Sequence, residues 1–125
     1  MESSVRRGRR GEAFAAAYLE SVGWRILDRN WRDGPREIDL VILRNGVVAF
    51  VEVKARTDGC AGSTLEAIHA GKRREIERAA RRWIRERAPE HPGVHTLRFD
   101  AVGVRILGRD RAEIRHVQGA WWTGE

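Results

Sequence analysis

The dipeptide Asn45-Gly46 separates two runs that are rich in valine, isoleucine and leucine, residues 36–44 and residues 47–55. Asn-Gly between two apolar, β-prone runs is the strongest short-range signal for a β-hairpin with a two-residue loop. Such a loop pairs Arg44 with Val47, and every other cross-strand pair follows by stepping outward from the turn. The sequence therefore predicts an antiparallel hairpin in a defined register.

This register brings charged side chains together at the end of the hairpin away from the turn. Asp39 is expected opposite Glu52 as a non-hydrogen-bonded pair, with Cβ atoms roughly 5 Å apart, and Glu37 is expected opposite Lys54. These four side chains share one face with four apolar residues, Val41, Leu43, Val48 and Phe50. The opposite face is expected to be core: Ile38, Leu40, Ile42, Val47, Ala49, Val51 and Val53.

Two carboxylates that face each other on a largely apolar surface destabilise a sheet unless something compensates their charge. A bound divalent cation removes the penalty. Because the expected ligands are carboxylate oxygens, with no histidine or cysteine among them, they favour Mg²⁺ or Mn²⁺ over zinc. The alternative is a solvated face, in which Glu37 and Lys54 form a simple cross-strand ion pair.

Lys54 favours the metal interpretation. Of the 24 basic residues only Lys54 and Lys72 are lysine, and the rest are arginine. Lys54 follows Glu52 by two residues, so both side chains leave the strand on the same side. An ammonium group can lose its proton, orient a water or neutralise a phosphate, whereas a guanidinium keeps its proton. The choice of lysine at this position indicates a need for an amine.

The rest of the chain predicts a mixed α/β domain that spans residues 1–125. Apolar periodicity indicates a helix from about Ser4 to Val22, closed by Gly23, and a second helix from His69 to Arg87. The remaining expected elements are a short strand at residues 24–27, a polar stretch ending in Gly34-Pro35, a glycine-rich loop at 58–63, a strand at 96–107, a turn at 108–110 and a final strand at 112–117.

Composition indicates a folded, soluble protein with a polyanionic partner. Hydrophobic residues make up 42% and charged residues 34% of the chain, and no apolar run approaches the roughly 20 residues of a membrane span. No signal peptide is recognisable, so we expect a cytoplasmic location. The lone Cys60 forms no intrachain disulfide. A net charge of +6 favours nucleic acid over a membrane or a small-molecule substrate.

Two groups of arginines are expected to contact phosphates, although a solvated surface is the alternative for both. They are Arg6, Arg7, Arg9 and Arg10 near the N-terminus and Arg73, Arg74 and Arg78 on the polar face of the second helix. Trp121 and Trp122 are expected either to stack on bases or, more simply, to pack within the protein.

Several of these segments together resemble the YraN-like family, bacterial proteins placed in the PD-(D/E)XK nuclease superfamily. The likeness runs from Gly8 to His116 and rests on Gly11-Glu12, Glu37-Ile38-Asp39-Leu40, residues 50–56 (FVEVKAR), Lys72 and Arg98-Phe99-Asp100. The first motif departs from the superfamily pattern because Ile38 replaces proline before Asp39.

The resemblance implies a restriction-endonuclease-like αβββαβ core, in which a mixed central sheet is flanked by helices. It implies that Asp39 and Glu52 bind a metal ion, with Glu12 and the backbone carbonyl of Val53 as further ligands. Lys54 would position or activate the attacking water. Glu37 and Lys72 would support the site, and Asp100 is expected to be a buried structural carboxylate near it.

The implied activity is that of a Mg²⁺- or Mn²⁺-dependent endonuclease that acts on nucleic acid. DNA is the favoured substrate, and branched DNA is suggested by analogy alone. A homodimer would be needed to cut two strands symmetrically. The alternatives are a non-catalytic nucleic-acid-binding or adaptor protein that retains the fold, and a basic protein associated with RNA or the ribosome.

Overall fold

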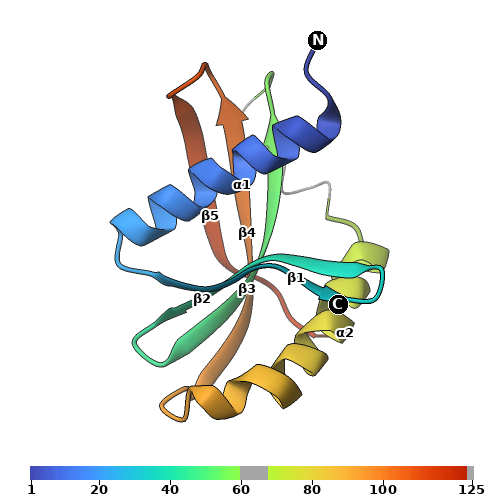
Figure 1. The fold of residues 1–125 in the computed structure, drawn as a ribbon, viewed down its shortest axis with the longest axis vertical. Helices are drawn as coiled ribbons and strands as arrows, with labels where there is room; N and C mark the ends of the chain where they lie inside the picture. The colour runs from blue at the N-terminus through green and yellow to red at the C-terminus, as the bar shows by residue number, and fades with distance from the viewer. Residues whose placement is uncertain (60–67, 124–125) are drawn as a thin grey trace.

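A mixed five-stranded sheet lies between two helices in the computed structural model, which describes residues 1–59 and 68–123 (Figure 1). The elements are α1 (Ser4–Ser21), β1 (Arg25–Asp33), β2 (Arg36–Arg44), β3 (Val47–Arg56), α2 (Ala70–Arg87), the 3₁₀ turn η2 (Ala88–Glu90), β4 (Thr96–Ile106) and β5 (Ala112–Trp121). Cys60 and most of the expected glycine-rich loop lie outside the described residues.

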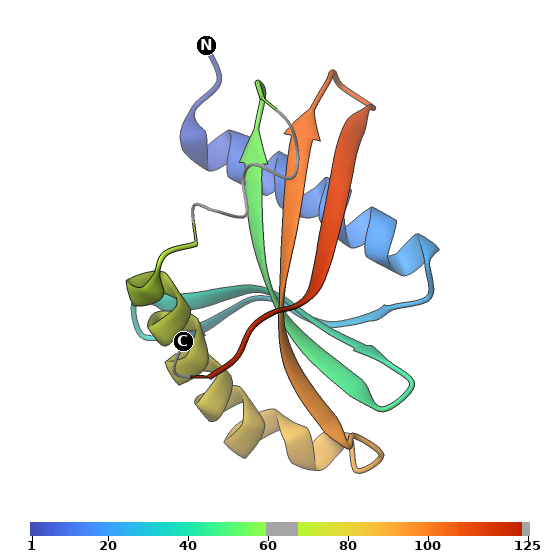
Figure 2. The ribbon, with the colours of Figure 1, turned by 180° about the vertical axis from the view of Figure 1, so that it is seen from behind.

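The strand order is β1-β2-β3-β4-β5, and neighbouring strands are antiparallel except for β3 and β4. The parallel pair is joined through α2, as a crossover between parallel strands requires. This topology confirms the predicted α/β class and the restriction-endonuclease-like core, with β5 added at one edge. In Figures 1 and 2 the sheet is strongly twisted, so β1 and β2 run across the direction of β4 and β5.

The ends of both helices are fixed by side chains that the sequence already indicated. The Ser3 hydroxyl accepts a hydrogen bond from the Arg6 amide at the start of α1, and the His69 ring accepts one from the Lys72 amide at the start of α2. Gly23 adopts a φ of 99° just after α1, a conformation that favours glycine. Both predicted helices are therefore confirmed to within one residue at each end.

Two strands are longer than predicted. The stretch expected to be a polar connection belongs to β1, which continues to Asp33, and β5 continues to Trp121 instead of ending near Val117. Both strands lie at the edges of the sheet. An edge strand has only one paired neighbour and carries polar side chains without penalty, so its sequence lacks the continuous apolar run by which central strands are recognised.

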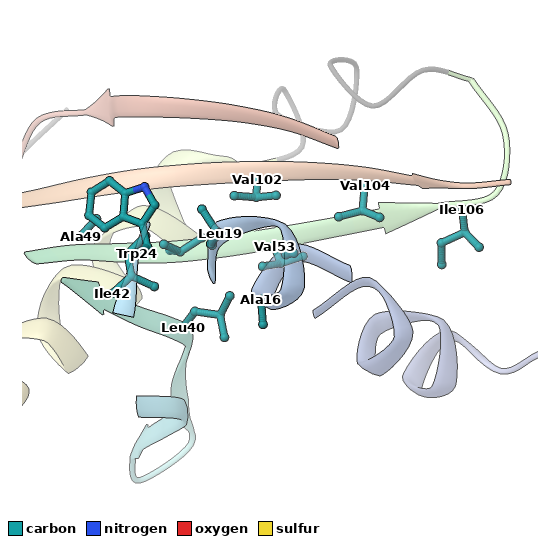
Figure 3. Close-up of a cluster of buried hydrophobic side chains, with 12 residues drawn as sticks. Ala16, Leu19, Trp24, Leu40, Ile42, Ala49, Val53, Val102, Val104 and Ile106 are labelled. Carbon is teal, nitrogen blue, oxygen red and sulfur yellow. The ribbon is translucent and has the colours of Figure 1, made fainter. Parts of the chain in front are cut away.

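Both faces of the hairpin are buried, as expected for a central sheet flanked by helices. The helix α1 covers one face over a cluster that includes Leu19, Trp24, Leu40 and Val53 (Figure 3). The helix α2 covers the other face, where Phe50 packs edge-on against Trp83 with ring centroids 5.5 Å apart. Because β2 and β3 are central strands between two helices, neither face remains for solvent.

One apolar residue lies on the face opposite to its predicted one. Ile38 was expected beside Leu40, but it is fully buried under α2 in the same cluster as Val41. The strict alternation of side chains therefore breaks between Ile38 and Leu40. The break is centred on Asp39, and it shapes the candidate site.

Gly11 lets α1 approach β3 closely. The residue is buried, and a Cβ added to it would overlap the Cβ of Ala55. We expect Gly11→Ala to lower the free energy of unfolding by about 1–3 kcal/mol, because the overlap forces the helix off the sheet. Gly8 in the same helix has no atom within 4 Å of such a Cβ, so Gly8→Ala should stabilise by up to ~1 kcal/mol. Urea unfolding of both variants tests this; equal stabilisation by both would contradict the close contact.

Candidate metal centre

The candidate site forms where the pairing of β2 with β3 ends. The predicted register is confirmed from Arg44–Val47 to Leu40–Val51, and no pair is formed between Asp39 and Glu52. In an unbroken ladder the Val53 amide would donate to the Ile38 carbonyl. It donates instead to Oδ2 of Asp39, at 2.8 Å. A side chain thus replaces the backbone partner, which fixes the Asp39 carboxylate beside β3.

Three carboxylates converge at this break. Glu12 from α1 and Glu37 and Asp39 from β2 each place an oxygen within 4.8 Å of the other two. All three side chains are half-buried. The structure therefore brings together Asp39 and Glu12, two of the four predicted ligands, and adds Glu37, which the sequence placed in a supporting role.

The cross-strand ion pair between Glu37 and Lys54, which the sequence left open as the alternative to a metal site, is not formed. The Glu37 carboxylate lies 3.0 Å from the Arg32 guanidinium on β1, whereas the Lys54 ammonium lies 3.6 Å from Glu52. The predicted pairing extrapolated the hairpin register past Leu40–Val51, where the ladder has already ended. Beyond that point, Glu37 interacts with the neighbouring edge strand.

Glu52 is the buried carboxylate of the site. It is 4% exposed, and its Oε1 atom lies 3.6 Å from Nζ of Lys54 and 4.0 Å from Nζ of Lys72. Both lysines of the chain therefore face one carboxylate. Among the described residues, Oε2 of Glu52 is a buried oxygen without a hydrogen-bond partner.

The site makes ionisation of Asp39 and Glu52 costly. Burial raises the pKa of Asp39 well above its usual range, and the charge of Glu52 raises it further against the opposing hydrogen bond from the Val53 amide. Glu12 and Glu37 add to this effect. Burial also raises the pKa of Glu52, although the ammonium groups of Lys72 and Lys54 partly offset it. Negative charge is thus concentrated where it is poorly solvated, which favours a cation.

The residues present fit a hard divalent cation. Every side-chain ligand offered by Glu12, Glu37, Asp39 and Glu52 is a carboxylate oxygen, the type that Mg²⁺ and Mn²⁺ prefer. Oε2 of Glu52 has no hydrogen-bond donor in the part of the chain that the structure describes, and a bound metal ion would supply the missing partner. The Val53 amide donates to Asp39, so the backbone of Val53 lies beside the acidic group.

The three carboxylates open into a cleft of about 520 Å³ that is also basic. Its walls include Arg9 from α1, Arg32 from β1 and Lys72 from the first turn of α2. Acidic groups at the floor and cations on the walls suit a ligand that is itself anionic and is held through a metal ion.

The seven arginines predicted to bind nucleic acid have different environments. Arg9 lines the acidic cleft, while Arg6 and Arg10 line a separate hollow of about 580 Å³. Arg10 is engaged within the protein, since it pairs with Glu2 at 2.8 Å. Arg7 is half-buried in the same helix.

On α2, Arg74 and Arg78 are exposed, but Arg73 is engaged within the protein. Its guanidinium donates to the Ile68 carbonyl and lies 5.7 Å from the ring of Trp121. Trp121 is 2% exposed and stacks on Phe99, so it packs within the protein, which was the simpler of the two expectations. Trp122 is 68% exposed. Contact with nucleic acid stays a prediction for these residues.

Sequence reasoning missed Asn30 and Arg32, both on β1. The Asn30 amide donates to Glu12 and to Glu37, and Arg32 pairs with Glu37. Their segment reads as a polar connection, and nothing in its local pattern places it against the acidic residues.

Asp100 is a structural carboxylate on β4. It is fully buried and accepts hydrogen bonds from Arg98 (2.8 and 3.0 Å), from the His116 ring (2.7 Å) and from the Gly119 amide (2.9 Å). Burial opposes its ionisation, but the His116, Arg98 and Gly119 hydrogen bonds outweigh that effect and hold its pKa below the usual range. The buried structural role expected for Asp100 is thereby confirmed.

We expect Asp100→Asn to lower the free energy of unfolding at neutral pH by about 1.5–3 kcal/mol, the typical value of a hydrogen bond to a charged group. The folded-state pKa lies below the unfolded value of about 3.9. The stabilisation is therefore complete above the unfolded pKa and is lost as the pH falls through the folded pKa. Denaturant unfolding across acidic pH should show the two proteins converging; a difference that stayed constant would contradict this role.

Comparison with known proteins places the chain in a family. The family model described as "Uncharacterised protein family UPF0102" matches residues 11–104, a span that includes the four carboxylates and both lysines of the site. A UPF0102 protein of Chlorobium chlorochromatii is 41% identical over 97% of this chain and 95% of its own. One from Syntrophotalea carbinolica is 42% identical over 91% and 89%, respectively. None of the helices in the described residues is long and apolar enough to cross a membrane. The chain belongs to the UPF0102 family, the YraN-like proteins that the motifs resembled.

Proposed function

We propose that this protein is a divalent-metal-dependent endonuclease that hydrolyses phosphodiester bonds in nucleic acid, with DNA as the favoured substrate. The observation that carries the proposal is the convergence of Glu12, Glu37 and Asp39 within 4.8 Å of one another beside a buried glutamate that faces two lysines. A solvated acidic surface needs neither the burial nor the lysines.

Asp39, Glu52 and Glu12 are the proposed side-chain ligands of Mg²⁺ or Mn²⁺, together with the Val53 carbonyl, and Glu37 supports them or joins them. A bound ion would act as a Lewis acid toward the scissile phosphate and make an attacking water more acidic. The carboxylates hold that position from three elements, α1, β2 and β3, so their geometry depends on the folded chain and not on a flexible loop.

Lys54 is the proposed catalytic amine. Its Nζ atom lies 3.6 Å from Oε1 of Glu52, and the side chain is partly exposed at the site. From there the ammonium group orients the attacking water or offsets the negative charge that develops on the phosphate in the transition state. Lys72, Arg9 and Arg32 are placed on the cleft walls to bind flanking phosphates.

The substrate is proposed to be held mainly through its phosphates. Cations line the cleft, and further exposed arginines lie on α2. Binding should therefore be sensitive to salt and weakly dependent on sequence. Branched DNA is proposed by analogy with resolvase-like enzymes, where two copies cut two strands symmetrically. We propose the bacterial cytoplasm as the place of this activity.

The test is cleavage of a panel of linear duplex, single-stranded, flap and four-way-junction DNA, with RNA as a further arm. Each substrate is incubated with Mg²⁺, Mn²⁺ or EDTA. The proposal predicts cutting that requires the metal and is lost in Glu52→Gln. If every substrate is bound but none is cut with either metal, the catalytic proposal fails and a non-catalytic binding protein becomes the better account.

A further inference from the structure

Asn30 lies level with Asp39 on the neighbouring strand. Its flanking residues Arg29 and Trp31 pair with Leu40 and Ile38 of β2, which places Asn30 across from the residue at which the β2–β3 ladder ends. The backbone of Asn30 is in the left-handed region, with a φ of 50°. Asparagine tolerates this conformation better than most residues, but the conformation still costs free energy. A residue keeps such a conformation where the surrounding structure requires it.

The Asn30 side chain joins two acidic residues from different elements. Its amide nitrogen donates to Oε1 of Glu12 on α1, at 2.8 Å, and to Oε1 of Glu37 on β2, at 2.5 Å. An amide group has two N–H donors, one for each carboxylate. A single neutral side chain thus bridges two like charges whose oxygens belong to the three-carboxylate group.

Neutrality is the useful property of this bridge. A lysine or arginine in the same place would also hold two carboxylates together, but its positive charge would satisfy them and compete with a metal ion. An amide fixes one oxygen of each carboxylate and adds no positive charge of its own, while Arg32 pairs with the other oxygen of Glu37. Residues that orient metal ligands in this way typically contribute about 10–100-fold in metal affinity.

We propose that Asn30 is a positioning residue that clamps Glu12 and Glu37 in the geometry in which they receive a divalent cation. The inference rests on the proposed metal site and deepens it, because it assigns a task to a residue that contacts the ligands and not the substrate. The left-handed backbone and the two hydrogen bonds have one explanation, since that conformation aims the amide at both carboxylates.

Asn30→Gly removes the amide and keeps a residue that favours a positive φ, so the fold is expected to persist. Asn45 supplies a matched control: it is also at a φ of 50°, but in the exposed β2–β3 turn. Titration of Mn²⁺ followed by electron paramagnetic resonance should give an affinity about 10–100-fold weaker for Asn30→Gly and unchanged for Asn45→Gly. Wild-type affinity in a folded Asn30→Gly protein would overturn the proposal.

A second measurement tests, in the absence of metal, whether Asn30 holds Glu12 and Glu37 together. Asn30→Asp keeps the shape of the side chain but replaces both donors with a third negative charge next to Glu12 and Glu37. In EDTA at mildly alkaline pH its melting temperature should fall by about 5 °C, a shift of ~1 kcal/mol for a domain of this size. Asn45→Asp should melt like the wild type, because Asp-Gly also suits a two-residue turn.

The two measurements separate this inference from the proposed function. If the wild-type protein binds no Mn²⁺, the proposed function fails, while the melting of Asn30→Asp in EDTA still tests the clamp. If Mn²⁺ binds the wild type normally and Asn30→Asp melts like the wild type in EDTA, the clamp is wrong and the metal site stands without it.

Discussion

Replacing Lys54 with alanine is expected to slow metal-dependent cleavage by about 10²–10³-fold, the usual loss when a general acid–base or charge-stabilising group is removed. The affinity for Mn²⁺ should not fall, because the lysine contributes no ligand. Removing a positive charge 3.6 Å from Oε1 of Glu52 leaves that carboxylate more available to a cation. Single-turnover cleavage and a Mn²⁺ titration on the same preparation measure the two quantities separately.

Two further substitutions distinguish an amine from a simple positive charge. Lys54→Arg keeps the charge but cannot give up its proton, so it should restore little of the lost rate if the amine acts on the water. Lys72→Ala removes the other lysine, whose Nζ is 4.0 Å from Oε1 of Glu52. Because Lys72 lines the cleft, the Lys72→Ala substitution should raise KM more than it lowers kcat. If Lys54→Ala cleaved as fast as the wild type, a catalytic role for Lys54 would be ruled out.

Asp39→Asn is expected to stabilise the metal-free protein while removing its response to metal. Burial and the neighbouring carboxylates raise the pKa of Asp39 in the folded state, so its ionised form is less favourable there than in the unfolded chain. At a pH below the unfolded pKa both states are protonated and the substitution changes little. As the pH rises toward the raised folded pKa, the cost grows, and above it the cost is complete.

The melting temperature in EDTA should therefore be higher for Asp39→Asn than for the wild type at neutral pH, by about 5 °C, and the two should converge in acid. Asparagine retains an oxygen that can accept from the Val53 amide, so this contact survives. Added Mn²⁺ should raise the melting temperature of the wild type only. Asp110→Asn, at an exposed turn, is the control. A destabilised Asp39→Asn protein, or one that responds to Mn²⁺, would contradict the account.

The hairpin could be predicted from sequence because its determinants are local. A two-residue Asn-Gly loop sets the register, and the register placed Asp39, Glu52 and Lys54 near one another before any tertiary contact was considered. The structure keeps that neighbourhood but replaces the expected Asp39–Glu52 pair with a hydrogen bond from the Val53 amide. Local periodicity assumes an unbroken ladder, so it could not reveal where the ladder ends.

The remaining parts of the site depend on contacts between distant segments. Glu12 reaches the site because α1 packs closely on β3, and in the sequence only a family resemblance indicated this role. Asn30 and Arg32 reach it because β1 extends along β2. The change of face at Ile38 has the same origin as the ladder break, and it could not be anticipated from alternation, which predicts the opposite face.

The most direct test of the metal centre is an equilibrium titration of the wild-type protein with Mn²⁺, followed by the loss of the free-ion paramagnetic resonance signal. We expect saturable binding at sub-millimolar Mn²⁺, competition by Mg²⁺, and loss of binding in Asp39→Asn. If all added Mn²⁺ remained free, or if Asp39→Asn bound it as tightly as the wild type, these carboxylates would not form a metal centre.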